Sequence, residues 1–471
     1  MSHEASTSGV EEHANTAAVL RITIVAAFGG FLFGYDSAVI NGAVASIREE
    51  FAIGAGPLGF AVASALIGAA VGAFFGGRIA DRMGRVPVMK IAAVLFLLSA
   101  LGCGLSYHLS WFILWRVVGG VAVGVASVIA PAYIAEVAPA ALRGRLGSLQ
   151  QMGIVLGIFI SLTVDALLAA WAGGASEPLW LGLEAWRWMF LAMSVPAVVY
   201  GIGAFVIPES PRYLVARGRQ DEARTVLTNL QGPVTASQRV VLIGETIQTE
   251  HQPRLADLRG RAGGLKPIVW VGIGLAALQQ FVGINVIFYY SNVLWQAVGF
   301  TEADSFVITV ITSVTNVVVT VVAIALVDRV GRKLLLIVGS AGMTLSLGTL
   351  AVVFATANVV DGQPVLGATA GPVALVAANL FVVFFGVSWG PVMWVLLGEM
   401  FPNMIRGAAL AVAGFVQWIA NFVVTVSFPA LADTSLGLAY GLYAFFALVS
   451  LLFALRAVRE TKGVELEDMQ D

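Results

Sequence analysis

Twelve runs of mostly apolar residues recur along this chain, each about as long as the ~20-residue helix that crosses a bilayer. The chain is 59% hydrophobic and 11% charged, whereas soluble proteins have about 25% charged residues. Lipid is therefore the solvent that these runs require, and the sequence predicts an all-α membrane protein with twelve transmembrane helices. The predicted spans are 19–43, 57–80, 88–106, 110–133, 146–172, 187–207, 266–298, 303–327, 334–356, 371–397, 406–429 and 436–458.

Lys and Arg residues are unevenly divided between the two sides of the predicted membrane protein. Of the 26 residues, all but three fall in the terminal segments and alternate loops of one side, or at the span ends that border them. Arg48 and Arg187 fall at loop ends on the other side, and Arg116 falls within a span. Because cytoplasmic loops are enriched in these residues, we expect both termini to be cytoplasmic. The expected location is the cell membrane, crossed many times.

The predicted spans divide the chain into two halves joined by a segment of soluble composition. We predict a cytoplasmic tail at 1–18, a six-helix bundle at 19–207, a linker at 208–265, a second six-helix bundle at 266–458 and a tail at 459–471. The linker contains "DEARTVLTNL" and similar stretches, which predict short amphipathic helices on the cytoplasmic side.

Composition and missing motifs argue against several classes of function. The net charge of −2 indicates no nucleic-acid partner. The single cysteine, Cys103, cannot form an intrachain disulfide and is interpreted as a small packing residue. We find no Walker motif and no cluster of metal ligands, and none of the four histidines lies deep in a span. We therefore expect no enzymatic activity, no metal and no cofactor.

Two short motifs occur once in each half, at corresponding cytoplasmic ends of spans. "DRMGR" (Asp81–Arg85) is repeated as "DRVGR" (Asp328–Arg332), and "EVAPAALRG" (Glu136–Gly144) as "EMFPNMIRG" (Glu399–Gly407). Such agreement indicates two six-helix bundles related as a parallel repeat. Transporters built in this way place their substrate site at the repeat interface, near the middle of the membrane.

Each of these loops combines carboxylates and arginines at fixed spacing. One interpretation is that they are topology signals in solvated loops. The other is a cytoplasmic gate, in which ion pairs form between the two halves when the cavity opens outward. Exposed pairs contribute about 0–1 kcal/mol each, so such a gate could close and still open in every cycle. The candidate gate residues are Asp81, Arg85, Glu136, Arg143, Asp328, Arg332, Glu399 and Arg406.

Further motifs extend this pattern over almost the whole chain. They are "GGFLFGYD", "GRIADRMGR", "WRVVGG", "PAYIAEVAPAALRG", "PESPRYL", "QQFVGINVIFYYS", "VDRVGRK" and "GPVMWVLLGEMFPNMIRG". Together they resemble the sugar porter family of the major facilitator superfamily, and within it bacterial proton:glucose and proton:xylose symporters. The resemblance implies the major facilitator fold. One departure is "RETKG" near the C-terminus, where the family has proline in place of Arg459.

Neutral amides and aromatic rings suit a sugar, because amides donate and accept hydrogen bonds while rings cover the C–H faces. The resemblance implies that the sugar is bound by Gln151, Gln279, Gln280, Asn285, Asn316, Trp394 and Gln417. We expect Phe33, Tyr289, Trp418 and Asn421 to line the cavity. The alternative is that these amides only join helices. Gln280 and Asn285 would diverge on a regular helix, so we expect a local break at Gly283.

Asp36 is a carboxyl group in the first span, and Arg116 is an arginine within the fourth. A charged side chain at the bilayer centre costs roughly 2.5–3.5 kcal/mol on insertion scales, and the resemblance places these two residues together. Burial favours a neutral carboxyl while a nearby arginine favours a charged one, so a small change of geometry could load or release a proton. The alternative is a fixed structural ion pair.

These observations predict a monomeric secondary transporter that imports a monosaccharide together with a proton, with glucose as the expected sugar. Two alternatives within the class are a uniporter, which would not need Asp36, and a symporter for xylose, galactose or another polyol. A sugar sensor is a more distant alternative, disfavoured by the short tails at 1–18 and 459–471. The expected partners are the sugar, the proton and the lipid bilayer.

Overall fold

The computed structural model describes residues 15–139, 143–249, 255–260, 264–360 and 363–461, and almost all of them are helical. The first half contains α1 (Thr16–Ala38), α2 (Ile40–Glu50), α3 (Ala55–Met83), α4 (Arg85–Gly104), α5 (Leu109–Val137), α6 (Arg143–Ala172), α7 (Ala185–Ala192) and α8 (Ser194–Val206). The linker contains α9 (Pro211–Ala216), α10 (Gln220–Gln231), α11 (Pro233–Thr249) and the 3-10 helix η2 (Leu255–Leu258). The second half contains α12 (Pro267–Phe281), α13 (Ile284–Ala297), α14 (Glu302–Val330), α15 (Arg332–Ala355), β1 (Asn358–Val360), β2 (Gln363–Val365), α16 (Ala370–Val387), α17 (Trp389–Met400), α18 (Asn403–Thr434) and α19 (Leu436–Arg456).

The described residues contain 12 helical segments that are long and apolar enough to cross a membrane, which confirms the predicted number of spans. Four of these segments consist of two helices each: α1 with α2, α7 with α8, α12 with α13, and α16 with α17. The first span was predicted too short, because it continues through the charged stretch that ends at Glu50. Its charges are accommodated there by partners: Glu50 pairs with Arg187, and Arg48 pairs with Asp433.

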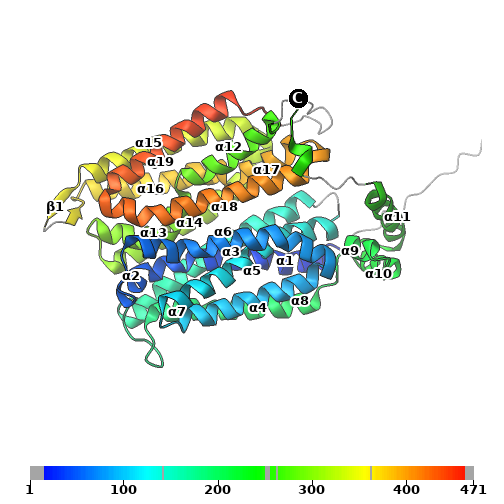
Figure 1. Ribbon diagram of the computed structural model, residues 1–471, viewed down its shortest axis with the longest axis horizontal. Helices are drawn as coiled ribbons and strands as arrows, with labels where there is room; N and C mark the ends of the chain where they lie inside the picture. The colour runs from blue at the N-terminus through cyan, green and yellow to red at the C-terminus, as the bar shows by residue number, and fades with distance from the viewer. Residues whose placement is uncertain (1–14, 140–142, 250–254, 261–263, 361–362, 462–471) are drawn as a thin grey trace, which may run out of the picture.

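The helices form two bundles that lie side by side (Figure 1). Helices α1 to α8 make up one bundle and α12 to α19 the other, as the sequence predicts. The bundles meet where α3 packs on α18, α6 on α14, and α2 on α13. Helices α9 to α11 lie at one end of the molecule, and the small β1–β2 hairpin, which was not predicted, lies at the opposite end.

Close helix packing within the first bundle depends on glycines that face a neighbouring backbone. A Cβ atom at Gly120 of α5 would lie 1.9 Å from the carbonyl oxygen of Ala65 in α3. A Cβ atom at Gly68 of α3 would lie 2.1 Å from the carbonyl oxygen of Val117 in α5. Only glycine permits this approach, and small residues four apart are how helices reach such contact in lipid. The regular glycine spacing in these two helices is therefore explained by packing.

The linker helices have a small apolar core of their own. It is formed by Leu214, Ala223, Leu227, Ala236 and Val240. Helix α9 begins at Pro211 and is capped by Ser210, whose hydroxyl accepts a hydrogen bond from the Tyr213 N–H at 3.3 Å. The Tyr213 hydroxyl donates to the carbonyl oxygen of Arg82 at the end of α3, which ties the linker to the first bundle.

Candidate functional site

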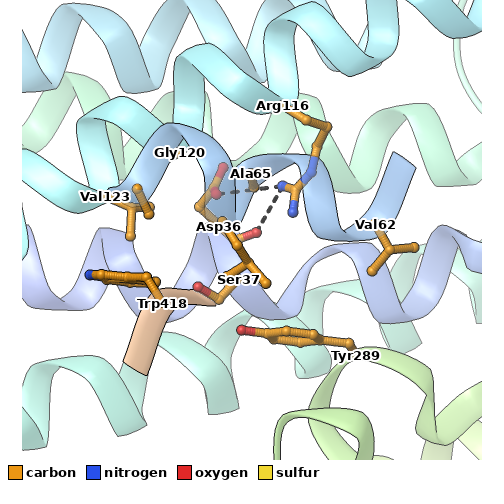
Figure 2. Close-up of a pocket in the computed structure, with 11 residues that line it drawn as sticks. Asp36, Ser37, Val62, Ala65, Arg116, Gly120, Val123, Tyr289 and Trp418 are labelled. Carbon is orange, nitrogen blue, oxygen red and sulfur yellow. Dashed lines mark hydrogen bonds and ion pairs between the residues drawn. The ribbon is translucent and has the colours of Figure 1, made fainter. Parts of the chain in front are cut away.

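Asp36 of α1 and Arg116 of α5 form an ion pair inside the first bundle (Figure 2). Arg116 Nη1 lies 3.4 Å from Asp36 Oδ2 and donates a shorter hydrogen bond of 3.0 Å to the backbone carbonyl oxygen of Asp36. Both side chains are 2% exposed. Asp36 Oδ1 and Arg116 Nε have no hydrogen-bond partner among the described residues. The carboxylate is therefore held by one long contact, which can break without the loss of a bidentate pair.

The same arginine helps to interrupt the first span. Helix α1 ends at Ala38 and α2 begins at Ile40. The carbonyl oxygen of Asp36 accepts from Arg116, while that of Tyr35 keeps its helix hydrogen bond from the Val39 N–H at 3.0 Å and also accepts from Ser161 Oγ at 3.2 Å. Side chains that insert into the ladder of helix hydrogen bonds bend the helix. The break therefore lies beside the ion pair, so a movement of Arg116 acts directly on the geometry of the span.

A small cavity of about 10 Å³ lies beside Asp36 and is lined by both halves of the chain. Asp36, Ser37 and Arg116 contribute from the first bundle, while Tyr289 of α13 and Trp418 of α18 contribute from the second (Figure 2). This volume holds about one water molecule, so the cavity must widen before a monosaccharide can enter. The remaining wall is apolar or small and consists of Val62, Ala65, Leu66, Ala69, Gly120 and Val123.

Aromatic and polar contacts join the two halves across this cavity. The rings of Phe33 and Trp418 lie 5.9 Å apart between centroids, with an interplanar angle of 40°. The Tyr289 hydroxyl interacts with Ser37, next to Asp36, and with Asn421 of α18. Of the four residues expected to line the cavity, Tyr289 and Trp418 do so, whereas Phe33 contacts Trp418 and Asn421 contacts Tyr289 outside the lining. Ser37 was not predicted, because a single serine in an apolar span is common.

Four of the predicted amide side chains form one continuous chain of hydrogen bonds. Gln279 Nε2 donates to the carbonyl oxygen of Trp389 at 2.8 Å, where α17 begins. Gln279 Oε1 accepts from Gln417 Nε2 at 2.6 Å and from Gln280 Nε2 at 3.2 Å. Asn285 Nδ2 in turn donates to Gln280 Oε1 at 2.6 Å. These amides satisfy one another here, and each can exchange an amide partner for a sugar hydroxyl.

The predicted break at Gly283 is confirmed. Helix α12 ends at Phe281, Gly283 has a left-handed backbone with φ of 80°, and α13 begins at Ile284. This break turns Asn285 back towards Gln280, which a continuous helix would not do. A Cβ atom at Gly283 would lie 2.7 Å from the ring of Tyr443, so both the backbone angle and the space require glycine.

We predict that Gly283→Ala destabilises the protein by about 1–3 kcal/mol, the usual cost of a strained left-handed residue, with the ring clash in addition. Thermal unfolding of the purified protein in detergent is the measurement. Gly348→Ala is the matched control, because it lies in α15 with open space around the position of a Cβ atom. Equal melting temperatures for the two variants would contradict the role assigned to Gly283.

Three predicted sugar-binding residues lie outside the amide chain. Trp394 of α17 is 42% exposed, Asn316 of α14 is buried, and Gln151 of α6 is half-buried. None of the three is hydrogen-bonded to the amide chain in the described part of the molecule. Their assignment to the sugar site stays a prediction.

The candidate gate residues form two matching clusters, one in each half. In the first, Arg85 binds Glu136 through Nε at 3.0 Å and Nη2 at 2.9 Å, and it binds Asp81 at 2.9 Å. In the second, Arg332 binds Glu399 through Nε at 3.0 Å and Nη2 at 2.7 Å. Both clusters join residues of the same half, so pairing between the halves remains a prediction for the outward-open state.

The other three gate candidates, Arg143, Asp328 and Arg406, add no ion pair to these two clusters among the described contacts. Arg406 donates from Nε to the carbonyl oxygen of Phe401 at 3.1 Å. The side chains of Arg143 and Asp328 lie outside the described residues. No cross-half partner can therefore be assigned to these two here.

Two carboxylates that were not selected from the sequence cap the helices of this region. Glu209 accepts from the backbone N–H groups of Arg85 and Val86 at 2.9 and 3.2 Å, at the start of α4. Glu460 accepts from those of Arg332 and Lys333 at 2.9 and 3.0 Å, at the start of α15. A carboxylate at a helix N-terminus is favourable. Since Glu460 keeps this position, the departure at Arg459 leaves the capping contact intact. Both glutamates stand in motifs noted in the sequence: Glu209 in "PESPRYL" and Glu460 in "RETKG".

Known proteins resemble this chain over almost its whole length. Residues 22–471 match the family model described as "Sugar (and other) transporter". The chain is 58% identical to a glucose transport protein of Synechocystis sp., over 98% of this chain and 99% of the relative. It is 37% identical to the D-xylose-proton symporter of Escherichia coli, over 97% of this chain and 96% of the relative. Among solved structures, it resembles the xylose transporter XylE from E. coli in a partially occluded inward-open conformation, with a TM-score of 0.82 and 36% identity, over 95% of this chain and 100% of that one.

Proposed function

Since this chain belongs to the sugar porter family of the major facilitator superfamily, we propose that it imports glucose together with a proton by alternating access. The observation that carries this proposal is the position of the Asp36–Arg116 pair on the same cavity as Tyr289 and Trp418. A titratable pair on a cavity lined by both halves is what coupling requires. The relatives support the same reading, one being a glucose transport protein and another a proton symporter.

The geometry supports a simple order of events. When the cavity faces outside, Asp36 takes up a proton and its contact with Arg116 breaks. The sugar then binds to the amide chain around Gln279, and its hydroxyls replace hydrogen bonds that the amides make with one another. The bundles rock about the site, the sugar leaves on the inner side, and Arg116 returns to Asp36 and displaces the proton. Free energy from the proton gradient thereby drives sugar uptake.

We place both termini and the linker 208–265 on the cytoplasmic side of a bacterial cell membrane, with the protein acting as a monomer. The distribution of Lys and Arg supports this orientation. In this orientation, the end of the molecule that carries α9 to α11 faces the cytoplasm, and the β1–β2 end faces outside (Figure 1).

A panel of labelled sugars tests the substrate in proteoliposomes, with and without an imposed pH gradient. We expect glucose to accumulate when the outside is acidic, and only to equilibrate without a gradient. If xylose or galactose is taken up faster than glucose, that sugar is the preferred substrate in place of glucose. Equilibration of every sugar under both conditions would identify a uniporter, and binding without transport would identify a sensor.

Contacts between the halves at the proposed extracellular end support an inward-facing state. Arg48 of α2 pairs with Asp433 of α18 at 3.1 Å. Asn41 of α2 donates from Nδ2 to the carbonyl oxygen of Phe288 at 2.8 Å, and its Oδ1 accepts from the Asn292 N–H at 3.0 Å. These contacts must separate before the cavity can open outward. The similarity to an inward-open relative agrees with this assignment.

We predict that the double variant Arg143→Ala, Glu399→Ala shifts the population towards the inward-open state, because the outward-open state loses a proposed cross-half contact. The readout is the labelling rate of a single cysteine placed at the cytoplasmic end of the cavity in a cysteine-free background. Arg219→Ala is a control, since Arg219 is exposed and pairs with Glu222 in the linker. An unchanged labelling rate in the double variant would favour plain topology signals over a gate.

A further inference from the structure

A second carboxyl group, Asp165 of α6, is buried in the first bundle. Among the residues whose burial is described, Asp36 and Asp165 are the only fully buried carboxyl side chains, and Asp165 is 0% exposed. It lies in "SLTVDALLAAW", within the predicted span 146–172 and two turns before its end. Asp36 was selected because it is a carboxyl group inside an apolar span. The same is true of Asp165, which the sequence prediction overlooked. It lies outside the cavity and the ion pair described above.

Unlike Asp36, Asp165 forms no ion pair with any residue that the structure describes. Neither of its carboxyl oxygens has a hydrogen-bond partner within normal distance among the described residues, although the Gly42 N–H interacts with the carboxyl group as a backbone donor. On the helices packed against α6, Arg116 is bound to Asp36, and Arg187 to Glu50 and Glu184. The charged side chains at the same end of those helices have partners of their own. Arg48 is bound to Asp433, Glu49 accepts from the Ser176 hydroxyl, and Glu302 accepts from the Ala175 N–H. An unpaired carboxylate in such a site is strongly disfavoured, and a group of this kind is neutralised by a proton.

The surroundings of Asp165 connect it to the break in the first span. A Cβ atom at Gly42 of α2 would lie 3.0 Å from Asp165 Cγ and 2.8 Å from Met189 Sδ, so the α2 backbone closes directly over the carboxyl group. Tyr35, the residue before Asp36, is the titratable side chain that interacts with Asp165, and its hydroxyl is also buried without a partner. Ser161, one turn before Asp165, donates to the Tyr35 carbonyl oxygen.

The position along the membrane is also informative. Gly42 lies six residues beyond Asp36, which is about 9 Å along a helix, towards the end that we assign to the outside. Asp165 is therefore on the extracellular side of Asp36, beneath the segment that carries the contacts of Asn41 and Arg48 with the second half. Separation of those contacts would bring water to the α2 side of Asp165.

We propose that Asp165 is a second proton-binding site, protonated in the state described here, which must take up its proton before α2 closes over it. The balance is simple: a carboxylate and a proton from external water form the carboxylic acid. This inference rests on the proposed transport function only for its role in the cycle. The protonation of Asp165 can be measured without any transport.

Infrared spectroscopy of purified protein in an ester-free detergent tests the proton directly. The spectra to compare are those of Asp36→Asn and of Asp36→Asn, Asp165→Asn, since the first substitution removes the other buried carboxyl. We expect the single variant to show, at neutral pH, the C=O stretching band of a protonated carboxyl, and the double variant to lack it. Asp221→Asn is the control, because the Asp221 side chain is 99% exposed and its loss should remove only carboxylate bands. A difference spectrum containing only carboxylate bands would overturn the proposal.

The role in the cycle has its own readout, the pH dependence of sugar exchange. In the Asp36→Asn background, exchange should fall at alkaline pH, by up to about tenfold per pH unit for one required proton. Adding Asp165→Asn should make exchange independent of pH in this range, since asparagine needs no proton to be buried. Identical pH profiles would overturn the role in the cycle. The two proposals can fail separately. If Asp36→Asn still accumulates sugar on a proton gradient, proton coupling through Asp36 is wrong. The infrared band would still identify Asp165 as a proton-binding site.

Discussion

Replacing Asp36 with Asn is expected to abolish sugar accumulation driven by a pH gradient, while sugar binding and exchange are retained. Asparagine keeps the shape of the side chain and its contact with Arg116, but it cannot carry a proton. One pH unit supplies about 1.4 kcal/mol per proton, so the unmodified protein should reach about tenfold accumulation in one-proton symport. In the variant, the internal and external sugar concentrations should become equal.

The measurement is the uptake of labelled glucose into proteoliposomes at a fixed pH difference, with exchange measured on the same preparation. Asp221→Asn is a matched control, since this linker residue is exposed and should leave accumulation unchanged. If Asp36→Asn still concentrates sugar when only a proton gradient is supplied, Asp36 is a structural group. Loss of exchange as well as accumulation would indicate that the Asp36–Arg116 contact is needed for movement itself.

Replacing Gln280 with Ala is expected to weaken glucose binding by about 1–3 kcal/mol, or about 5- to 150-fold in affinity. The substitution removes the acceptor of Asn285 and one donor to Gln279, so it breaks the amide chain at its centre. In the complex, the sugar hydroxyls that we propose the Gln280 amide binds are left without a partner, and this loss carries the cost. Asn285→Ala should have an effect of similar size, and the two effects should not add, because both residues belong to one chain of hydrogen bonds.

Equilibrium binding titrations on the purified variants provide the test. Asn379→Ala is the control, since Asn379 is also an amide within a span but donates to the Leu375 carbonyl oxygen, away from this chain. Unchanged affinity in both Gln280→Ala and Asn285→Ala would remove the amide chain from the sugar site. In that case the amides would serve to join helices, as the alternative interpretation holds.

The sequence allowed the twelve spans to be predicted, because their length and apolar composition are local properties. The break at Gly283 was predictable for a related reason: the helix period places Gln280 and Asn285 on diverging faces, and glycine permits the turn between them. The break at Val39 was not predictable. No glycine or proline marks it, and its neighbouring carbonyl groups are engaged by Arg116 and Ser161 from other helices.

The partners of charged residues were harder to predict than the residues themselves. The repeated motifs identified Arg85 and Glu136, but which half supplies each partner depends on the conformation of the bundles, and here the pairs lie within one half. Glu209 and Glu460 were missed because their contacts are with backbone N–H groups, which every residue carries. Asp165 was missed although its position in an apolar span resembles that of Asp36.

The most direct test of coupled transport is to let sugar drive the proton. Proteoliposomes containing the protein are prepared with equal pH on both sides in a weakly buffered medium, with the membrane potential clamped, and glucose is then added outside. Symport through Asp36 predicts a rise in external pH when glucose is added, larger with a steeper sugar gradient and absent in Asp36→Asn. Entry of labelled glucose at the same rate with no change of external pH would contradict proton coupling.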